Sequence, residues 1–295
     1  MTTGKPLSVV GVGASSVRLP SGPWAILLEF LDARFPDVGR DIWLARMDGG
    51  KVLDAAGDCL RGDTAYVAGS LVHYYRELAD EPRIPFEETI LFRDEHLLVA
   101  DKPHFLPVIP SGRFVRETLL VRLKQRLGIE SLTPIHRIDR GTAGVVIFSC
   151  NAETRDAYQG LFRRREIHKL YEALAPLSNT LNLPLIHRSR LVAGEPFFRM
   201  QEVPGIANSE THIDIHQSLG EYALYKLQPV TGRKHQLRVH MAALGCTIVN
   251  DDFYPQLRVE TVEDYARPLK LLARSVRFRD PLNGQERYFE SGRNL

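Results

Sequence analysis

One carboxylate near the middle of the chain is placed as a catalytic group could be. Asp139 lies between Arg137 and Arg140, in the stretch HRIDRGTAGVVIF that begins at His136. A glycine-containing loop followed by an apolar strand can hold a side chain rigidly and still let a ligand approach. Positive neighbours favour the ionised form that a nucleophile or base requires. An isolated R-x-D-R is more often a surface ion pair, so Asp139 alone is only a candidate.

A second stretch combines cations with an aromatic ring. Arg163–Arg165 end a predicted helix, where they either complement the helix dipole or bind nucleic-acid phosphates, and Lys169 follows. Tyr171 then shares one face of a predicted strand with Ala173 and Ala175. A tyrosine flanked by alanines leaves room for a flat ring to stack on it. Taken by itself, however, Tyr171 is more simply interpreted as a core aromatic.

The third stretch is TGRKHQLRVHMAALG, from Thr231 to Gly245. We expect Thr231 to cap the start of a helix and Gly245 to end it. Arg238 borders the predicted buried face, from which it could reach a buried carboxylate. His235 and His240 are five positions apart, which separates them by roughly 140° around a helix. Zinc-binding helices use a spacing of four, so no metal site is predicted from this pair.

Taken together, and in this order, the three stretches resemble the RluA family of RNA pseudouridine synthases. The family motif H-R-L-D-R-x-T-S-G appears as HRIDRGTAG, and K-x-Y-x-A appears as Lys169, Tyr171 and Ala173. The motif T-G-R-x-H-Q-I-R-x-H is matched from Thr231 onward. The resemblance extends over about residues 84–281.

Two shorter matches and one departure accompany these motifs. The family's D-K-P appears as Asp101-Lys102-Pro103, and its G-D-x-x-Y is matched by Asp251 and Tyr254, with Asn250 in place of the glycine. Where the family often has L-H-A, this chain has Leu271-Leu272-Ala273. The resemblance therefore implies nothing for this last segment.

The resemblance implies that the protein isomerises uridine to pseudouridine in ribosomal or transfer RNA, without a metal or other cofactor. Asp139 is implied to attack the ribose anomeric carbon or the uracil ring of a flipped-out uridine. Tyr171 is implied to stack on the uracil and help remove a proton, and Arg238 to pair with the aspartate. Arg137 is implied to insert where the uridine leaves the RNA stack. The residues implied to contact RNA are His136, Arg137, Arg140, Thr142, Lys169, Arg233, His235 and Gln236.

The elements around these residues predict an α+β fold. Strands are expected at 89–92, 96–100, 145–148, 169–175 and 221–227, and helices at 117–127 and from an Asn151 cap to about 165. Without a regular βαβ rhythm, the catalytic domain is expected to hold a mostly antiparallel or mixed sheet flanked by helices and loops. Ahead of it we expect a small α/β module with helices at 24–35 and 42–47 and a hairpin of 51–53 with 64–67.

The predicted domain boundaries follow from these elements. Residues 1–22 form a loose lead-in, 23–80 a module that faintly resembles the S-four-type RNA-binding domain, and 81–295 the catalytic domain. Residues 80–85 form the linker between the two domains, since their two prolines disfavour both helix and central strand.

Composition limits the class of protein. With 295 residues, 44% of them hydrophobic and 25% charged, the chain has the balance of an ordinary globular protein. A net charge of +2 does not by itself indicate a nucleic-acid partner, so local clusters must carry that argument. Three scattered cysteines, no membrane-length apolar run and no secretory signal lead us to expect a cytoplasmic protein without a membrane partner. The sequence gives no sign of the oligomeric state, and a monomer is the default expectation.

Two other functions fit parts of this pattern. A non-catalytic RNA-binding or ribosome-assembly protein could keep the same fold, but Asp139, Tyr171 and Arg238 are all present. A metal-dependent nuclease or phosphoesterase requires clustered acidic and histidine ligands, which the histidine spacing argues against.

Overall fold

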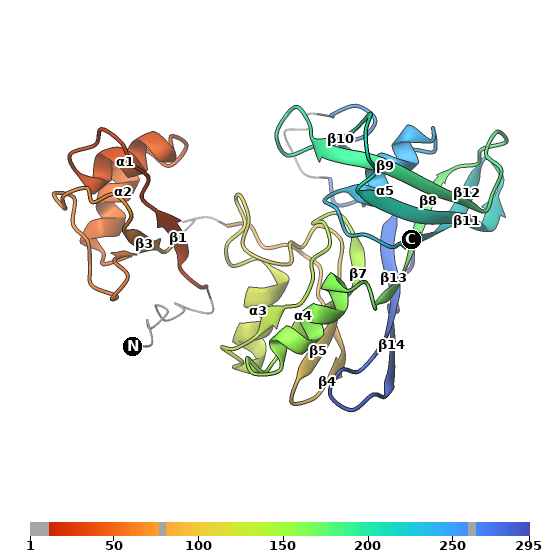
Figure 1. Cartoon of the computed structure of the whole chain (residues 1–295), viewed down its shortest axis with the longest axis horizontal. Helices are drawn as coiled ribbons and strands as arrows, with labels where there is room; N and C mark the ends of the chain where they lie inside the picture. The colour runs from red at the N-terminus through yellow and green to blue at the C-terminus, as the bar shows by residue number, and fades with distance from the viewer. Residues whose placement is uncertain (1–11, 77–80, 259–263) are drawn as a thin grey trace. The chain divides into compact units, whose positions relative to one another are not determined.

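The computed structural model describes residues 12–76, 81–258 and 264–295. Residues 1–11 of the predicted lead-in and residues 77–80, where the predicted module ends and the linker begins, lie outside the described residues. The chain divides into two compact units (Figure 1). The smaller unit consists of the chain up to Pro82 together with two later segments, residues 110–116 and 121–130. The sequence predicts these two segments as part of the catalytic domain. The larger unit contains residues 83–109, 117–120 and 131–295.

The smaller unit packs two helices on a short sheet. Helices α1 (Leu27–Arg34) and α2 (Arg40–Asp48) accompany strands β1 (Ser15–Arg18), β2 (Val52–Leu53) and β3 (Leu71–Tyr74), in the order β1-β3-β2. Trp43 is fully buried and packs on Phe35 and Tyr74. Burial of such large aromatic surfaces is what lets so small a unit fold.

Two predictions for the smaller unit are wrong. The segment 15–18 is a strand paired with β3, so the lead-in is not loose throughout. The predicted strand at 64–67 does not form, and the partner of β2 is β3 instead. Within that segment Tyr66 packs on Trp24 and Phe30, and its hydroxyl donates to the Pro20 carbonyl. The aromatic side chain of Tyr66 therefore packs in the core although residues 64–67 do not form a strand.

The larger unit is built on an 11-stranded sheet. Its strand order is β10-β9-β11-β12-β8-β13-β7-β5-β4, with β14 beside β13 and β6 beside β7. All neighbours are antiparallel except β13 and β7, which are parallel. The expected α+β fold with a mixed sheet is therefore confirmed. The strands are β4 (Thr89–Arg93), β5 (Leu97–Lys102), β6 (Thr133–Pro134), β7 (Ala143–Ser149), β8 (His168–Pro176), β9 (Leu185–Ala193), β10 (Met200–Val203), β11 (Ser209–Leu219), β12 (Tyr222–Pro229), β13 (Leu271–Arg279) and β14 (Glu286–Glu290).

Two helices pack on different parts of this sheet. Helix α4 (Arg155–Arg163) buries Tyr158 and Leu161 in a cluster with side chains of β5, β7 and β13. Helix α5 (Gln236–Ala243) buries Leu237 and Met241 against β8, β11 and β12. Each helix thus covers its own hydrophobic cluster of the sheet.

The predicted start of helix α4 is wrong. Asn151 was expected to cap α4, but the helix begins at Arg155, and Asn151 Oδ1 instead accepts the Glu153 amide in a preceding turn.

Helix α3 (Leu119–Leu127) forms as predicted, two residues shorter. Among the described residues, no helix combines the length and the apolar character needed to cross a membrane.

The parallel contact between β7 and β13 requires a glycine. Gly144 lies opposite Ala273, and it has a φ of +111°. A Cβ atom at residue 144 would lie 2.2 Å from the Ala273 carbonyl oxygen. Only glycine therefore allows β13 to run this close to β7, immediately after the loop that carries Asp139.

We expect Gly144→Ala to lower the free energy of unfolding by about 2–5 kcal/mol, because it combines a disfavoured φ with a backbone clash. Gly292→Ala is the control, since a Cβ there meets nothing within 4 Å. Denaturant unfolding of both variants measures the difference. Equal stabilities would contradict this account of the β7–β13 contact.

Candidate active site

A buried lysine, Lys102, holds the loop that carries Asp139. Lys102 at the end of β5 is 0% exposed, and its ammonium donates to the carbonyls of Pro103 (2.9 Å), Leu106 (2.8 Å) and Arg140 (3.1 Å). All three N–H groups of the ammonium are thereby used. Burial holds the pKa of Lys102 well below its usual range, while the charge of Asp139 acts in the opposite direction. Lys102 thus ties the residue after Asp139 to the end of β5.

Helix α5 brings Arg238 to the same place. Its guanidinium forms a bidentate pair with Asp251 at 2.6 and 2.8 Å, and its Nη1 lies 3.3 Å from Asp139 Oδ2. It is 6% exposed and lies over the ring of Phe253, 4.7 Å from its centroid. Burial opposes the charged form, but the hydrogen bonds and charge of Asp251, together with Asp139, raise the pKa of Arg238. Arg238 therefore contacts Asp139 as predicted, while its stronger partner is Asp251.

A neutral histidine lies on the other side of the carboxylate. His235 Nε2 is 3.9 Å from Asp139 Oδ1, and its Nδ1 is 2.9 Å from the Tyr254 hydroxyl. That hydroxyl accepts the Met200 amide, so it can donate its own proton to Nδ1 and leave the imidazole proton on Nε2. Burial lowers the pKa of His235 to about 4. At neutral pH, Asp139 is thus faced by one fixed charge and one neutral ring.

The loop before α5 is shaped by Gln236. Its Oε1 accepts from the Thr231 hydroxyl (2.6 Å) and the Arg233 amide (3.1 Å), and its Nε2 donates to Glu210 O and Thr211 Oγ1, both at 2.9 Å. These four bonds use the whole capacity of the amide. Gln236 therefore fixes the loop and has no group left for RNA. Thr231 is not the predicted N-cap, because the helix is preceded directly by His235, whose φ is +53°.

Tyr171 reaches the site from β8. Burial raises the pKa of its phenol, and the charge of Asp139 raises it further. The ring is therefore neutral and available for stacking. The neighbouring Lys169 also points to this region, where it donates to the Thr231 carbonyl at 3.2 Å.

One cavity of about 100 Å³ collects these side chains. It contains all three predicted catalytic residues and most of the predicted RNA-contacting ones. Its lining consists of Arg137, Ile138, Asp139, Thr142, Lys169, Tyr171, Pro229, Thr231, Gly232, Arg233, His235, Gln236, Leu237, Arg238 and Leu271. Segments more than 90 residues apart in the sequence thus meet at Asp139, as its 3.3 Å contact with Arg238 shows.

Two predicted RNA-contacting residues are placed outside this lining. His136 Nε2 accepts the Ile147 amide at 3.1 Å, and its ring stacks on Phe162. Burial lowers the pKa of His136 to about 3, which keeps that nitrogen an acceptor. Arg140 gives its carbonyl to Lys102 and directs its Nη1 to the Phe105 carbonyl at 3.4 Å. Both residues shape the loop that carries Asp139.

Among the residues of the site that were not predicted to belong to it, two hold its charged groups and one departs from the family pattern. Asp251 and Lys102 lie in the short motifs G-D-x-x-Y and D-K-P, so the motifs were a signal for them. Leu271 forms part of the cavity wall, and Leu272, which occupies the position of the family histidine, is 0% exposed. The departure from L-H-A therefore places a leucine in the core.

Comparison with known proteins agrees with this geometry. A model of the RNA pseudouridylate synthase family matches residues 96–243, which include Asp139, Tyr171 and Arg238. An uncharacterized RNA pseudouridine synthase of Synechocystis sp. is 30% identical over 236 residues, covering 77% of this chain and 79% of the relative. The dual-specificity RNA pseudouridine synthase RluA of Vibrio vulnificus is 33% identical over 212 residues, covering 68% and 80%.

Solved structures give the same result. Human RNA pseudouridylate synthase domain containing 4 superposes with a TM-score of 0.53 at 26% identity, covering 68% of this chain and 87% of that one. The human domain containing 1 protein has a TM-score of 0.58, at 22% identity, and shares the fold over 72% and 86%. The chain belongs to the family of RNA pseudouridine synthases. Within that family it is of the RluA type, and its activity is the isomerisation of uridine to pseudouridine in RNA.

We expect Asp251→Asn to lower kcat at least about tenfold, about 1.4 kcal/mol in barrier height, because Arg238 loses the charge that holds it. Asp214→Asn, on the exposed side of β11, is the matched control. Single-turnover rates on an RNA substrate measure the effect. An unchanged rate in Asp251→Asn would show that the guanidinium does not need this partner.

We also expect stability to fall on acidification. For His235 and His240, the folded-state pKa values of about 4 and about 3 lie below the unfolded value of 6.5. The unfolded chain therefore binds more protons, and the stabilisation present above pH 6.5 is lost as the pH falls towards 4. The loss at pH 5 is about 2 kcal/mol for each of the two histidines at most. Urea unfolding at pH 7 and pH 5 measures it, and equal midpoints would refute it.

Proposed function

We propose that Asp139 is the nucleophile of the isomerisation, that Tyr171 stacks on the uracil, and that Arg238 orients the carboxylate. The observation that carries this proposal is the meeting of these three side chains, from separate segments of the chain, in one cavity. Arg238 is immobilised by Asp251, so its contact with Asp139 restricts where the attacking oxygen can lie. A carboxylate held in this way loses little freedom on the way to the transition state.

The proposed proton path follows from the state of Tyr171. Attack by Asp139 on the anomeric carbon or on the uracil ring frees the base to rotate and to rejoin through carbon-5, after which the proton on that carbon must leave. A phenol with a raised pKa already carries its proton and is a poor acceptor. We assign stacking to Tyr171. Asp139 recovers its charge when its bond to the substrate breaks, so it can take the proton from carbon-5 and pass it to N1 of the ring, whose bond to the ribose has been broken.

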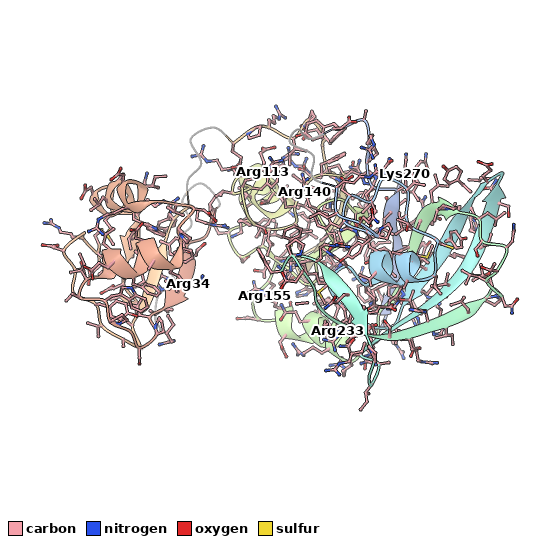
Figure 2. All side chains as sticks on the ribbon, turned by 90° about the horizontal axis from the view of Figure 1, so that it is seen from above. Arg34, Arg113, Arg140, Arg155, Arg233 and Lys270 are labelled. Atoms are coloured by element: carbon pink, nitrogen blue, oxygen red, sulfur yellow. The ribbon has the colours of Figure 1, made fainter. Side chains whose placement is uncertain are left out.

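A basic groove next to the cavity supports RNA as the substrate. It has a volume of about 360 Å³ and is lined by Phe162, Arg163, Arg165, Ile167, Lys169, Val230, Thr231, Gly232 and Arg233. Lys169, Thr231, Gly232 and Arg233 line both spaces. The smaller cavity suits the extruded base, and the larger groove suits the backbone phosphates beside it. Arg233, which lines both spaces, is labelled in Figure 2.

For the target, we propose a uridine in structured ribosomal or transfer RNA. A relative from Saccharomyces cerevisiae, 31% identical over 186 residues, is a tRNA pseudouridine(31) synthase, and the Vibrio relative is of dual specificity. We further propose that the enzyme acts as a cytoplasmic monomer and that the small N-terminal unit contributes to RNA binding. Mapping pseudouridine in total RNA from a strain without the gene would identify the target.

The experiment that tests the proposed function is Asp139→Asn. We expect turnover to fall by at least about 1000-fold, while RNA affinity changes by less than about threefold, because the substitution removes the charge and keeps the shape. Pseudouridine formation and RNA binding are measured on the same preparations. Wild-type turnover in Asp139→Asn would refute the nucleophile. A wild-type protein that binds RNA without converting any uridine would favour the non-catalytic alternative.

We expect Arg165→Ala and Arg233→Ala to weaken RNA binding with little effect on single-turnover chemistry. Each should lower the slope of log affinity against log salt by about one, because each removes one phosphate contact. Arg83→Ala is the control, since that side chain is 76% exposed and pairs with Glu87. Salt slopes equal to that of the wild type would place the phosphates elsewhere.

A further inference from the structure

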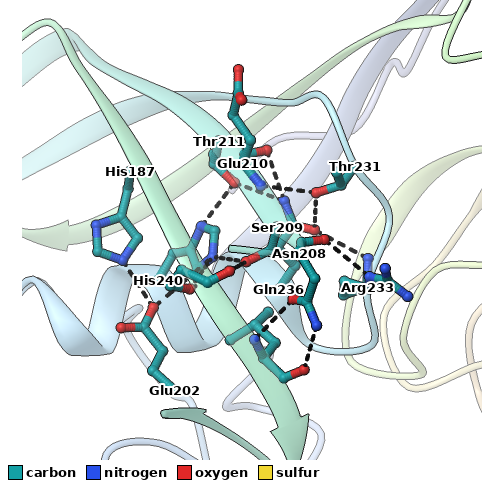
Figure 3. Close-up of polar contacts among 12 residues, drawn as sticks. His187, Glu202, Asn208, Ser209, Glu210, Thr211, Thr231, Arg233, Gln236 and His240 are labelled. Atoms are coloured by element: carbon teal, nitrogen blue, oxygen red, sulfur yellow. Dashed lines mark hydrogen bonds and ion pairs between the residues drawn. The ribbon is translucent and has the colours of Figure 1, made fainter. Parts of the chain in front are cut away.

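A cluster of potential metal ligands lies outside the catalytic cavity. His187 of β9, Glu202 of β10 and His240 of α5 converge, with candidate ligand atoms all within 4.8 Å of one another (Figure 3). His187 Nε2 is 2.8 Å from Glu202 Oε1, and His240 Nε2 is 3.9 Å from the same oxygen. None of the three lines the cavity around Asp139, and the proposed reaction does not use them.

The chemistry of this donor set is that of a zinc site. Two imidazoles and one carboxylate are a common ligand set for a zinc ion that keeps one position for water. Magnesium prefers oxygen ligands in octahedral geometry and is therefore a poor match. The side chains of His187 and Glu202 are 19% and 25% exposed, so a metal ion and its water could enter from solvent.

The third ligand is fixed in place before any ion arrives. The His240 side chain is 0% exposed, and its Nδ1 is 2.9 Å from Thr211 Oγ1. Metal-binding histidines characteristically use their second nitrogen in such a hydrogen bond, which orients the ring. Burial lowers the pKa of His240 to about 3, so the ring is neutral, as a ligand must be.

We propose that His187, Glu202 and His240 bind a divalent zinc ion, with water as the fourth ligand. Tetrahedral geometry at metal–ligand distances of about 2.1 Å places ligand atoms about 3.4 Å apart. The distances of 2.8 and 3.9 Å bracket this value. Small rotations of the two partly exposed side chains close the site around the buried imidazole.

Binding of the zinc ion would replace hydrogen bonds of these side chains with metal–ligand bonds. In the metal-free protein, a proton lies between His187 and Glu202, and the Ser209 hydroxyl is 2.9 Å from His240 Nε2. Ser209 donates to the Ser189 carbonyl, so it accepts the Nε2 proton of His240. The ion takes the place of both protons: each imidazole then carries its proton on Nδ1, which for His240 is donated to Thr211. Each imidazole keeps one proton, so the protein releases none and its own net charge does not change.

The ion would join β9 and β10 to α5, the helix that carries Arg238. We therefore assign it a structural role, in which zinc stabilises the elements behind the catalytic cavity. This inference does not depend on the identity of the nucleophile, so it can fail or hold independently of the proposed reaction.

The test is a competition titration of the chelator-stripped full-length protein with zinc and a chromophoric chelator. We expect one equivalent to bind with a Kd of about 1 μM or lower, and the melting temperature to rise in its presence. His187→Ala and the isosteric Glu202→Gln should each weaken binding at least about 30-fold. His216→Ala, an exposed histidine of β11 outside the cluster, should bind as the wild type does.

Cobalt(II) absorption on the same variants provides a second readout that does not rely on folding stability or activity. Far-UV circular dichroism confirms that each variant is folded, which is expected because both substituted side chains are partly exposed. Absence of stoichiometric zinc binding by the wild type would overturn the proposal. Binding that persists unchanged in folded His187→Ala and Glu202→Gln would do the same.

Discussion

The rest of the site depends on the ion pair between the buried guanidinium of Arg238 and Asp251. A charge that is 6% exposed is stable in the folded protein only with a close counter-ion, and Asp251 supplies one through two short hydrogen bonds. The remaining Nη1 then faces Asp139 at 3.3 Å. Because the stronger pair satisfies the desolvated charge, the weaker contact can orient the carboxylate that we propose as the nucleophile and still leave it partly exposed in the cavity.

The fold supplies the other constraints on Asp139. Lys102 holds the carbonyl of the next residue from inside the sheet, and Gly144 allows β13 to approach β7 directly after the loop. Gln236 shapes the opposite wall by saturating its amide with the loop before α5. Polar groups whose hydrogen bonds are all formed inside the protein give a cavity its shape, while Asp139 and Tyr171 remain partly exposed in it.

Much of the fold and site could be predicted from the sequence, for identifiable reasons. Strands β5, β7 and β8 have strong apolar or alternating patterns, and the motif around Asp139 is distinctive in company with Tyr171 and Arg238. Local signals were less reliable. Thr231 and Asn151 look like N-caps because of their residue types. In the structure the Thr231 hydroxyl donates to Gln236 and Asn151 accepts the Glu153 amide, so these local hydrogen bonds hold both residues ahead of the helices.

Long-range pairings could not be read from spacing. Nothing in the sequence says that His240 meets His187 and Glu202, since these residues come together only through the order of β9, β10 and α5. The division of Arg238 between Asp251 and Asp139 was hidden for the same reason. His136 shows the converse: a motif residue that looked able to contact RNA is used internally by the Ile147 amide.

The central claim is that Asp251 acts on Asp139 through Arg238. A double-mutant cycle of single-turnover rates tests it most directly, with Arg238→Ala, Asp251→Asn and the combined variant. If the residues act as one unit, the combined variant will be about as slow as the slower single variant, with a coupling energy of about 0.5–3 kcal/mol. Rate losses that multiply in the combined variant would show that the two residues act independently, and would contradict the account.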